Sequence, residues 1–98
     1  MKYKLHPEAE TDLSRAMDHY EEIRPGLEQE FRTEVEVVIH DLLHVTCAGP
    51  AIIADCRFRL PKRFPYIVLY RVRADTIQII GVVHDKRDLS FIEKRLAD

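Results

Sequence analysis

The stretch RFPYIVLYRVRADTIQIIGVVHDKR, residues 63–87, decides the fold of this chain. Within it, residues 66–72 and 77–83 are nearly all apolar, and many of them are β-branched or aromatic. Such runs are typical of central strands that are covered on both faces of a sheet. The polar segment between them, residues 73–76 with Asp75, predicts a hairpin turn. The fold is therefore expected to be built on this pair of strands.

A third strand is predicted just before this pair. In residues 56–60, apolar side chains alternate with Arg57 and Arg59, which is typical of a strand that has one face on a core. The apolar positions are Cys56, Phe58 and Leu60. We expect the arginine face of this strand to contact solvent or a ligand.

Two amphipathic helices are predicted on the N-terminal side of the strands. Apolar residues recur at steps of three and four in residues 9–23 and again in residues 27–45. Pro7 suits the first turn of the first helix, and Pro25–Gly26 separates the two periodic segments, so the helices form a hairpin. Gly49–Pro50 is expected to stop the second helix.

Shorter elements are predicted at both ends of the chain. Residues 2–5 are predicted to form an edge strand, and Asp88 to be the N-cap of a short C-terminal helix. The apolar positions of that helix are Leu89, Ile92 and Leu96. The result is a single α+β domain over residues 1–98, in the order β-α-α-β-β-β-α. Its N-terminal helical hairpin packs on a small, mainly antiparallel sheet.

The second face of the predicted sheet has little to cover it. If the helical hairpin packs on one face, only the short C-terminal helix remains to shield the apolar residues of the other. These residues are Ile67, Leu69, Ile80 and Val82, or their counterparts at Tyr66 and Val68. Monomeric proteins seldom expose a large contiguous apolar patch without a partner. We therefore expect open apolar surface on this face and another polypeptide that packs against it.

Charge is distributed unevenly along the chain. The first fifty residues hold five Lys and Arg against eleven Asp and Glu, whereas the remainder holds ten against six. The net charge of −2 therefore hides an acidic part and a basic part, and the basic part suits nucleic acid or an acidic protein. A plainer interpretation is that exposed edge cations prevent aggregation of the sheet. The candidate binding residues are Arg57, Arg59, Lys62, Arg63, Arg71 and Arg87.

Chain length, apolar runs and cysteine content limit the classes of protein to which this chain can belong. The chain of 98 residues is long enough for one core, and its apolar runs are too short to span a membrane, so we predict a cytoplasmic protein. Cys47 and Cys56 are predicted to be reduced thiols, with Cys56 packed in the core. His40 and His44 stand at i and i+4 with Cys47 three residues on, a spacing that can chelate zinc.

Neither the histidines nor the acidic face of the hairpin predicts a site. No fourth ligand is adjacent to the histidines, and they fall opposite the apolar stripe, so we predict exposed histidines and expect no metal or cofactor. The acidic positions of the second helix are predicted to form a solvated surface. They are Glu28, Glu30, Glu34 and Glu36.

The motif FPY-x-V-x-Y at residues 64–70, followed by H-x-x-R at residues 84–87, resembles the ParE branch of the RelE/ParE superfamily of bacterial toxins. The segments HPEAETDLSRAMDHYEE and GLEQEFRTEVEVVI are similar to the two helices of that family, so the resemblance covers nearly the whole chain. It implies a toxin that is neutralised by a cognate antitoxin, whose disordered tail folds across the helical hairpin and sheet. Characterised ParE members inhibit DNA gyrase, whereas RelE members cleave mRNA on the ribosome.

Three positions separate these two activities. RNA cleavage needs a proton acceptor, cations around the phosphate and an acid for the leaving oxygen. Arg57 and Arg59 match the basic second-strand positions of RelE-type enzymes. At three further positions, where those enzymes have arginine, arginine and tyrosine, this chain has Ile67, Asp85 and Phe91. The resemblance therefore implies a non-enzymatic toxin that binds DNA gyrase, with the cations as contacts for target or antitoxin.

Two alternatives remain. The first is a ribosome-dependent mRNA endonuclease that uses His84 with Arg57, Arg59 and Arg87, because histidine titrates near neutral pH and Arg59, Arg71 and Arg87 are candidates to lie beside it. The structural interpretation of the same residues is that His84 closes the last strand and hydrogen-bonds the terminal helix, which Arg87 fixes. The second alternative is an inactive homologue that retains only antitoxin binding.

Overall fold

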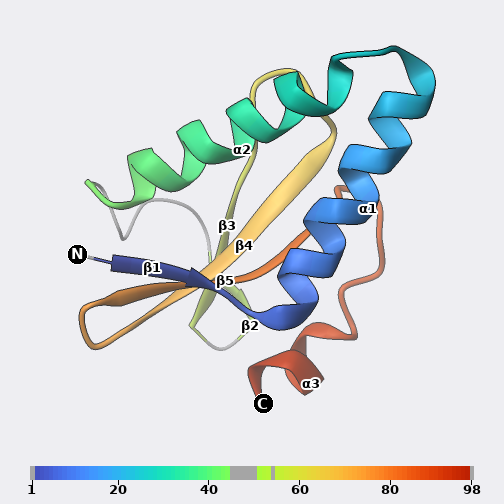
Figure 1. Ribbon diagram of the computed structural model, residues 1–98. Coiled ribbons are helices and arrows are strands. Elements are labelled where there is room, and N and C mark those ends of the chain that lie inside the picture. Colours follow the sequence, from blue (N-terminus) through green and yellow to red (C-terminus); the bar gives the residue numbers. More distant parts are fainter. Residues whose placement is uncertain (1, 45–50, 54, 98) are drawn as a thin grey trace.

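The computed structural model describes residues 2–44, 51–53 and 55–97. Its elements follow the order β1 (Lys2–Leu5), α1 (Pro7–Ile23), α2 (Leu27–Leu42), β2 (Ala51–Ile53), β3 (Cys56–Arg59), β4 (Tyr66–Arg73), β5 (Thr76–His84) and α3 (Ile92–Leu96) (Figure 1). The five-stranded sheet has the order β1-β5-β4-β3-β2, in which β1 is parallel to β5 and the other neighbours are antiparallel. The predicted α+β fold is confirmed.

Two elements differ from the prediction. β2 was not predicted, because a three-residue strand is too short to show an alternating pattern. α3 is five residues long and follows Phe91 rather than starting at Asp88. The Asp88 carboxylate instead accepts a hydrogen bond from the backbone N–H of Ser90 (2.9 Å) and stabilises the turn before the helix. The predicted helix stop at Gly49–Pro50 lies outside the described residues.

The ends of the helical hairpin have local causes. His6 caps α1, since its Nδ1 accepts a hydrogen bond from the backbone N–H of Glu8 (3.1 Å). Pro7 occupies the first turn, where its missing N–H costs nothing. Between the helices Gly26 has a φ of 89°, a left-handed conformation that glycine adopts without a steric penalty. The Glu21 carboxylate accepts from the Gly26 N–H at 2.9 Å and fixes this turn.

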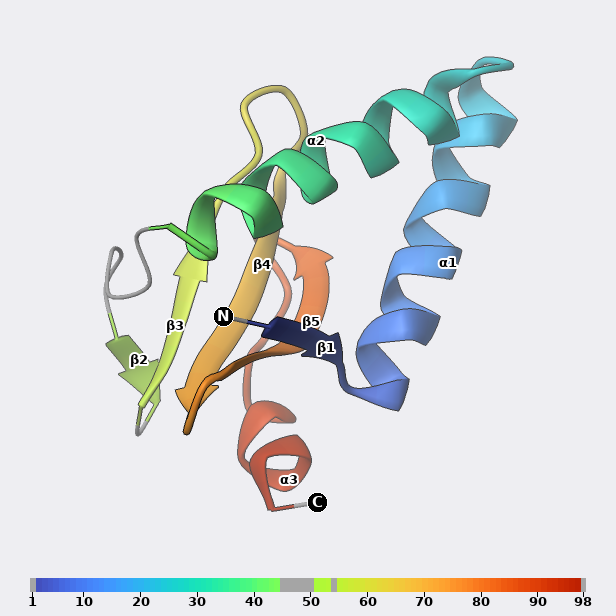
Figure 2. The same ribbon diagram turned by 60° about the vertical axis from the view of Figure 1, so that its left-hand side comes forward.

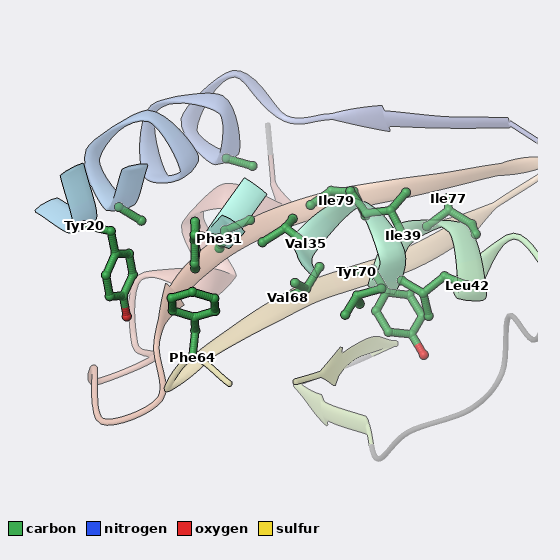
Figure 3. Close-up of a cluster of buried hydrophobic side chains, with 14 residues drawn as sticks. Tyr20, Phe31, Val35, Ile39, Leu42, Phe64, Val68, Tyr70, Ile77 and Ile79 are labelled. Atoms are coloured by element: carbon green, nitrogen blue, oxygen red, sulfur yellow. The ribbon is translucent and has the colours of Figure 1, made fainter. Parts of the chain in front are cut away.

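α1 and α2 lie on one face of the sheet and enclose the larger of two apolar clusters (Figure 2). Aromatic rings gather at one end of it, as Figure 3 shows for Tyr20, Phe31 and Phe64, whereas Tyr70 lies toward the other end. The rings whose centroids lie 5.1 Å from that of Phe31 are those of Tyr20, Phe64 and Tyr66. Phe64 and Tyr66 belong to the FPY motif, which is therefore part of the core.

The opposite face carries the second cluster, beneath α3. Ile67, Leu69 and Ile80 are between 0 and 6% exposed there. The residues that pack over them from β3, α3 and the turn before α3 are Phe58, Leu89, Phe91, Ile92 and Leu96. The expectation that these strand residues stay open is therefore wrong, because the segment before the short helix adds apolar side chains of its own.

A β-bulge explains why Val82 is not in this second cluster. The register of β4 and β5 shifts beside Gly81, between Leu69 and Tyr70 of β4. Such a bulge changes the alternation of side chains along a strand. Val82 consequently packs on the helix side, whereas Ile80, two residues earlier, packs beneath α3. A strict period of two cannot place both residues correctly.

A buried ion pair joins α1 to α3 beyond the end of β1. Asp12 and Arg95 are each 7% exposed, and two guanidinium nitrogens donate to the carboxylate at 2.6 and 3.1 Å. β1 pairs with β5 only as far as Ile79. Past that point the Val82 N–H donates to Asp12 (3.2 Å), and Arg95 donates to the Ile80 carbonyl (3.1 Å). The pair therefore satisfies backbone groups on the unpaired edge of β5.

Candidate functional site

The predicted cations do not form one patch. Arg57 and Arg59 of β3 stand opposite Tyr70 and Val68 of β4, which belong to the cluster beneath α1 and α2. Because directly opposed residues of an antiparallel pair point to the same face, both arginines lie on the helix side of the sheet. Each is half-buried, so the predicted arginine face is only partly open to solvent.

Arg71 lies on the opposite face. It stands opposite Gln78 of β5, and its Nε donates to Gln78 Oε1 at 2.7 Å. Lys4 of β1 is the partner of Gln78 on the other side, so these three residues form a row across the sheet. Sequence reasoning missed Lys4 as a member of the basic surface. Its signal was the alternation of Lys2 and Lys4 with apolar residues in the first strand.

Arg63 is engaged in the structure itself. It lies in the loop between β3 and β4, forms an ion pair with Glu34 and donates to Glu30 at 3.1 Å. Hydrogen bonds from Arg24 and then from Arg63 lower the pKa of Glu30. The predicted solvated glutamate surface is thus partly ion-paired, because this loop folds back on α2. Lys62, beside Arg63, is exposed.

Arg87 fixes the segment that leads to α3. Its guanidinium lies 4.0 Å from the centre of the Phe91 ring and its Nη1 lies 3.9 Å from Asp12. Arg95 stacks on the same ring at 4.5 Å. Phe91 therefore contacts two cations of the network that holds the terminal helix, an arrangement that favours a structural role for Arg87.

His84 ends β5 and binds the turn that follows it. Its Nδ1 accepts a hydrogen bond from the backbone N–H of Lys86 (3.1 Å) and lies 3.3 Å from the Asp85 carboxylate. The ring packs edge-on against Tyr66 at 5.5 Å, and burial raises the pKa of that tyrosine. His84 closes the strand as expected, but its hydrogen bond goes to this turn rather than to the terminal helix.

The register separates His84 from the other arginines. His84 stands opposite Tyr66 at the start of β4, whereas Arg71 stands opposite Gln78. Six residues of strand separate positions 84 and 78, or about 20 Å. Arg59 is on β3, on the far side of β4 from His84. The structure therefore does not place Arg71 beside His84 as the endonuclease alternative expects, whereas Arg59 lies on the same face of the sheet as His84, two strands away.

The cysteine and histidine predictions have separate outcomes. Cys56 is fully buried, and burial raises its pKa to about 11, so the thiol stays protonated at neutral pH. Cys47 lies outside the described residues. His40 and His44 are exposed, with ring centroids 4.8 Å apart. Across residues 2–44, 51–53 and 55–97 the structure contains no cluster of three potential metal ligands.

Sequence reasoning also missed the ion pair of Asp12 and Arg95. The signal was present, because Asp12 falls between Ala9 and Ala16 on the apolar stripe of α1. Gly81 leaves room for the pair: a Cβ atom there would lie 3.0 Å from Arg95 Nη1 and 3.3 Å from Asp12 Oδ2. Three residues from distant parts of the chain thus form one structural unit.

The fold agrees with comparisons with known proteins. A family model described as "ParE toxin of type II toxin-antitoxin system, parDE" matches residues 3–89. The chain belongs to the ParE toxin family. It is accordingly a toxin of the type II toxin–antitoxin class. The matched range takes in the hairpin and the sheet from Tyr3 onward, and it ends at Leu89 in the turn that precedes α3.

A solved structure supports the fold of this ParE-family toxin. A chain of the "Chromosomal ParDE TA system from P. aeruginosa" superposes with a TM-score of 0.76. The two chains are 24% identical, and the match covers 86% of this chain and 95% of the other. A search of curated proteins found no match. None of the helices that the structure describes has the length and apolarity to cross a membrane.

Proposed function

We propose that this ParE-family toxin inhibits DNA gyrase by direct binding, without chemistry of its own, and that a cognate antitoxin holds it inactive. The observation that supports binding over cleavage is the environment of the three substituted positions. Ile67 is 6% exposed in the cluster beneath α3, and the Phe91 ring contacts the guanidinium groups of both Arg87 and Arg95. Asp85 places a negative charge 3.3 Å from His84.

This environment is unsuited to phosphodiester cleavage for a physical reason. The transition state gathers negative charge on the phosphate oxygens, and enzymes stabilise it with cations that converge on one point. Here His84 is about 20 Å along the strand from Arg71. Arg63 and Arg87 are held by Glu34 and Phe91. A binding surface needs no such convergence.

We expect induction of this toxin in bacterial cells to stop growth with DNA breaks and an SOS response, while transcripts stay intact. The variant His84→Ala should behave as the wild type, because no step depends on proton transfer. Growth, gyrase–DNA cleavage complexes and mRNA 5′ ends would be measured in parallel after induction. Cleavage of mRNA on ribosomes that requires His84 would establish the endonuclease instead. Unimpaired growth would indicate an inactive homologue.

The antitoxin is proposed to cover the helical hairpin and β1. A groove of about 430 Å³ lies between β1 and α2 and is lined by Tyr3, Val37 and Leu43 among others. Tyr3 is 47% exposed and Val37 is 53% exposed, which leaves two large apolar side chains in contact with water. An apolar face of an antitoxin segment would remove both from water, and this burial would favour binding.

The variant Val37→Asp should weaken antitoxin binding by about a hundredfold, since burying an unpaired carboxylate costs several kcal/mol. Isothermal titration calorimetry with the antitoxin encoded by the neighbouring gene would measure the effect. Lys86→Gln, which lowers the net charge by the same one unit at an exposed position in the turn after β5, is the matched control and should bind as the wild type. Equal affinity of Val37→Asp and the control would place the antitoxin elsewhere.

A further inference from the structure

We propose that a second groove, beside β1 and the start of α1, binds an acidic polypeptide segment that carries a bulky apolar side chain. The groove has a volume of about 570 Å³. Its apolar lining includes Leu5, Pro7 and Ile80, and its cationic lining consists of Lys4 and Arg71. The row that contains Lys4 and Arg71 lies on the α3 side of the sheet, away from the hairpin groove assigned to the antitoxin.

Cations form two rows beside this groove. Lys4 and Arg71 stand on either side of Gln78, and Lys2 and Arg73 take the equivalent positions one row closer to the hairpin turn. Neighbouring strands are about 4.8 Å apart, so the two cations of a row have backbones about 10 Å apart. The two rows begin where α3 no longer covers the sheet, because Arg71 is the next residue after Leu69 on the same face of β4.

The carboxylates near the groove are already engaged. Glu8 lines the groove, but its Oε2 lies 3.8 Å from Arg95 Nε. Asp55 forms an ion pair with Arg73, the last residue of β4. Among the described residues no carboxylate forms an ion pair with Lys4 or Arg71, and Arg71 donates only to the neutral Gln78 amide within that set. Asp55, whose pKa is lowered chiefly by its hydrogen bond with Arg73, is also influenced by the charge of Arg71, but no ion pair among the described residues joins Asp55 to Arg71. Lys4 and Arg71 can therefore both pair with a carboxylate of a ligand.

The shape and lining favour a polypeptide over nucleic acid. Proteins that bind single strands combine cations with aromatic rings on which bases stack. The described lining of this groove contains no Phe, Tyr or Trp, and its apolar part includes the aliphatic side chains of Leu5 and Ile80. In an extended peptide, side chains on one face recur at every second residue, about 7 Å apart. Carboxylates four residues apart therefore flank one apolar side chain on the same face. The flexible side chains of Lys4 and Arg71 can reach both carboxylates while this apolar side chain enters the groove.

The test uses the full chain and a fluorescein-labelled acidic octapeptide with a central Phe-Leu pair. The double variant Lys4→Gln/Arg71→Gln should bind it about tenfold more weakly than the wild type, and raised salt should weaken wild-type binding. Nuclear magnetic resonance of the ¹⁵N-labelled chain should show peptide-induced shifts at Lys4, Arg71 and Gln78 and none at Val37. Thermal melting of each variant checks that it is folded.

A matched control removes two cations elsewhere. Arg15→Gln/Lys86→Gln changes the net charge equally at exposed positions and should bind as the wild type. A peptide in which Ser-Ser replaces Phe-Leu should bind more weakly, because the groove would stay empty. The proposal is overturned if the wild type does not bind the octapeptide, or if the two double variants bind it equally. It is also overturned if an eight-nucleotide oligothymidylate binds the wild type more tightly than the octapeptide does and binds the Lys4→Gln/Arg71→Gln variant more weakly than the wild type.

Discussion

Asp12→Ala is expected to destabilise the fold by about 3–5 kcal/mol, because it leaves the Arg95 guanidinium buried without its carboxylate. Arg95 is 7% exposed, and its closest acceptor on Asp12 is at 2.6 Å. The substitution also removes the acceptor of the Val82 N–H on the edge of β5. Small domains are stable by only about 5–15 kcal/mol, so the variant would lose a large part of its stability.

Urea denaturation followed by circular dichroism would measure this loss. The double variant Asp12→Ala/Arg95→Met separates the cost of an unpaired charge from the value of the pair. It should recover much of the lost stability, since replacing both members of a buried pair by apolar groups is often nearly neutral. A single variant within about 0.5 kcal/mol of the wild type, the range typical of exposed substitutions, would contradict a buried pair that holds α1 to α3.

Phe31→Ala is expected to cost about 3–5 kcal/mol, as other deletions of buried aromatic side chains do. Phe31 is fully buried, and the rings of Tyr20, Phe64 and Tyr66 surround it. Its removal would leave a cavity where α1, α2 and the start of β4 meet. Because the structure relaxes only in part around such a cavity, most of the lost contacts would not be replaced.

Two controls calibrate this result in the same urea titrations. Phe31→Leu keeps an apolar side chain and should cost less than half as much, since it leaves a smaller cavity. Val37→Ala lies on the same helix at 53% exposure and should change stability by at most about 0.5 kcal/mol. A Phe31→Ala variant as stable as Val37→Ala would show that the aromatic cluster does not hold the hairpin on the sheet.

Local patterns were sufficient to predict most of the fold. The alternation in β3, the apolar runs of β4 and β5, and the periodic stripes of α1 and α2 each reflect a single buried face, and each appears as predicted. β2 and α3 were missed or misplaced because they have three and five residues, too few for a periodic signal. The bulge at Ile80, beside Gly81, shifts the alternation of side chains along β5, which no strict period represents.

The surface could be predicted less well than the core. A pattern gives the face on which a residue lies, but pairing with a distant residue depends on register and on loops. Arg63 was predicted to bind a partner, yet it is held by Glu34, and Arg71 lies on the opposite face from Arg57. Lys4 joins Arg71 only because β1 is parallel to β5, a neighbour that the sequence pattern does not specify.

The parallel pairing of the first strand with the last has a consequence for synthesis on the ribosome. β1 leaves the exit tunnel early, but its partner β5 lies more than seventy positions later, and Asp12 binds a residue 83 positions away. Contacts so distant in sequence form late and slowly. A nascent chain that ends before Arg95 has both helices but no completed sheet edge. The contacts that complete this edge of the sheet therefore form only after Arg95 has emerged, well after both helices and the first strand have been synthesised.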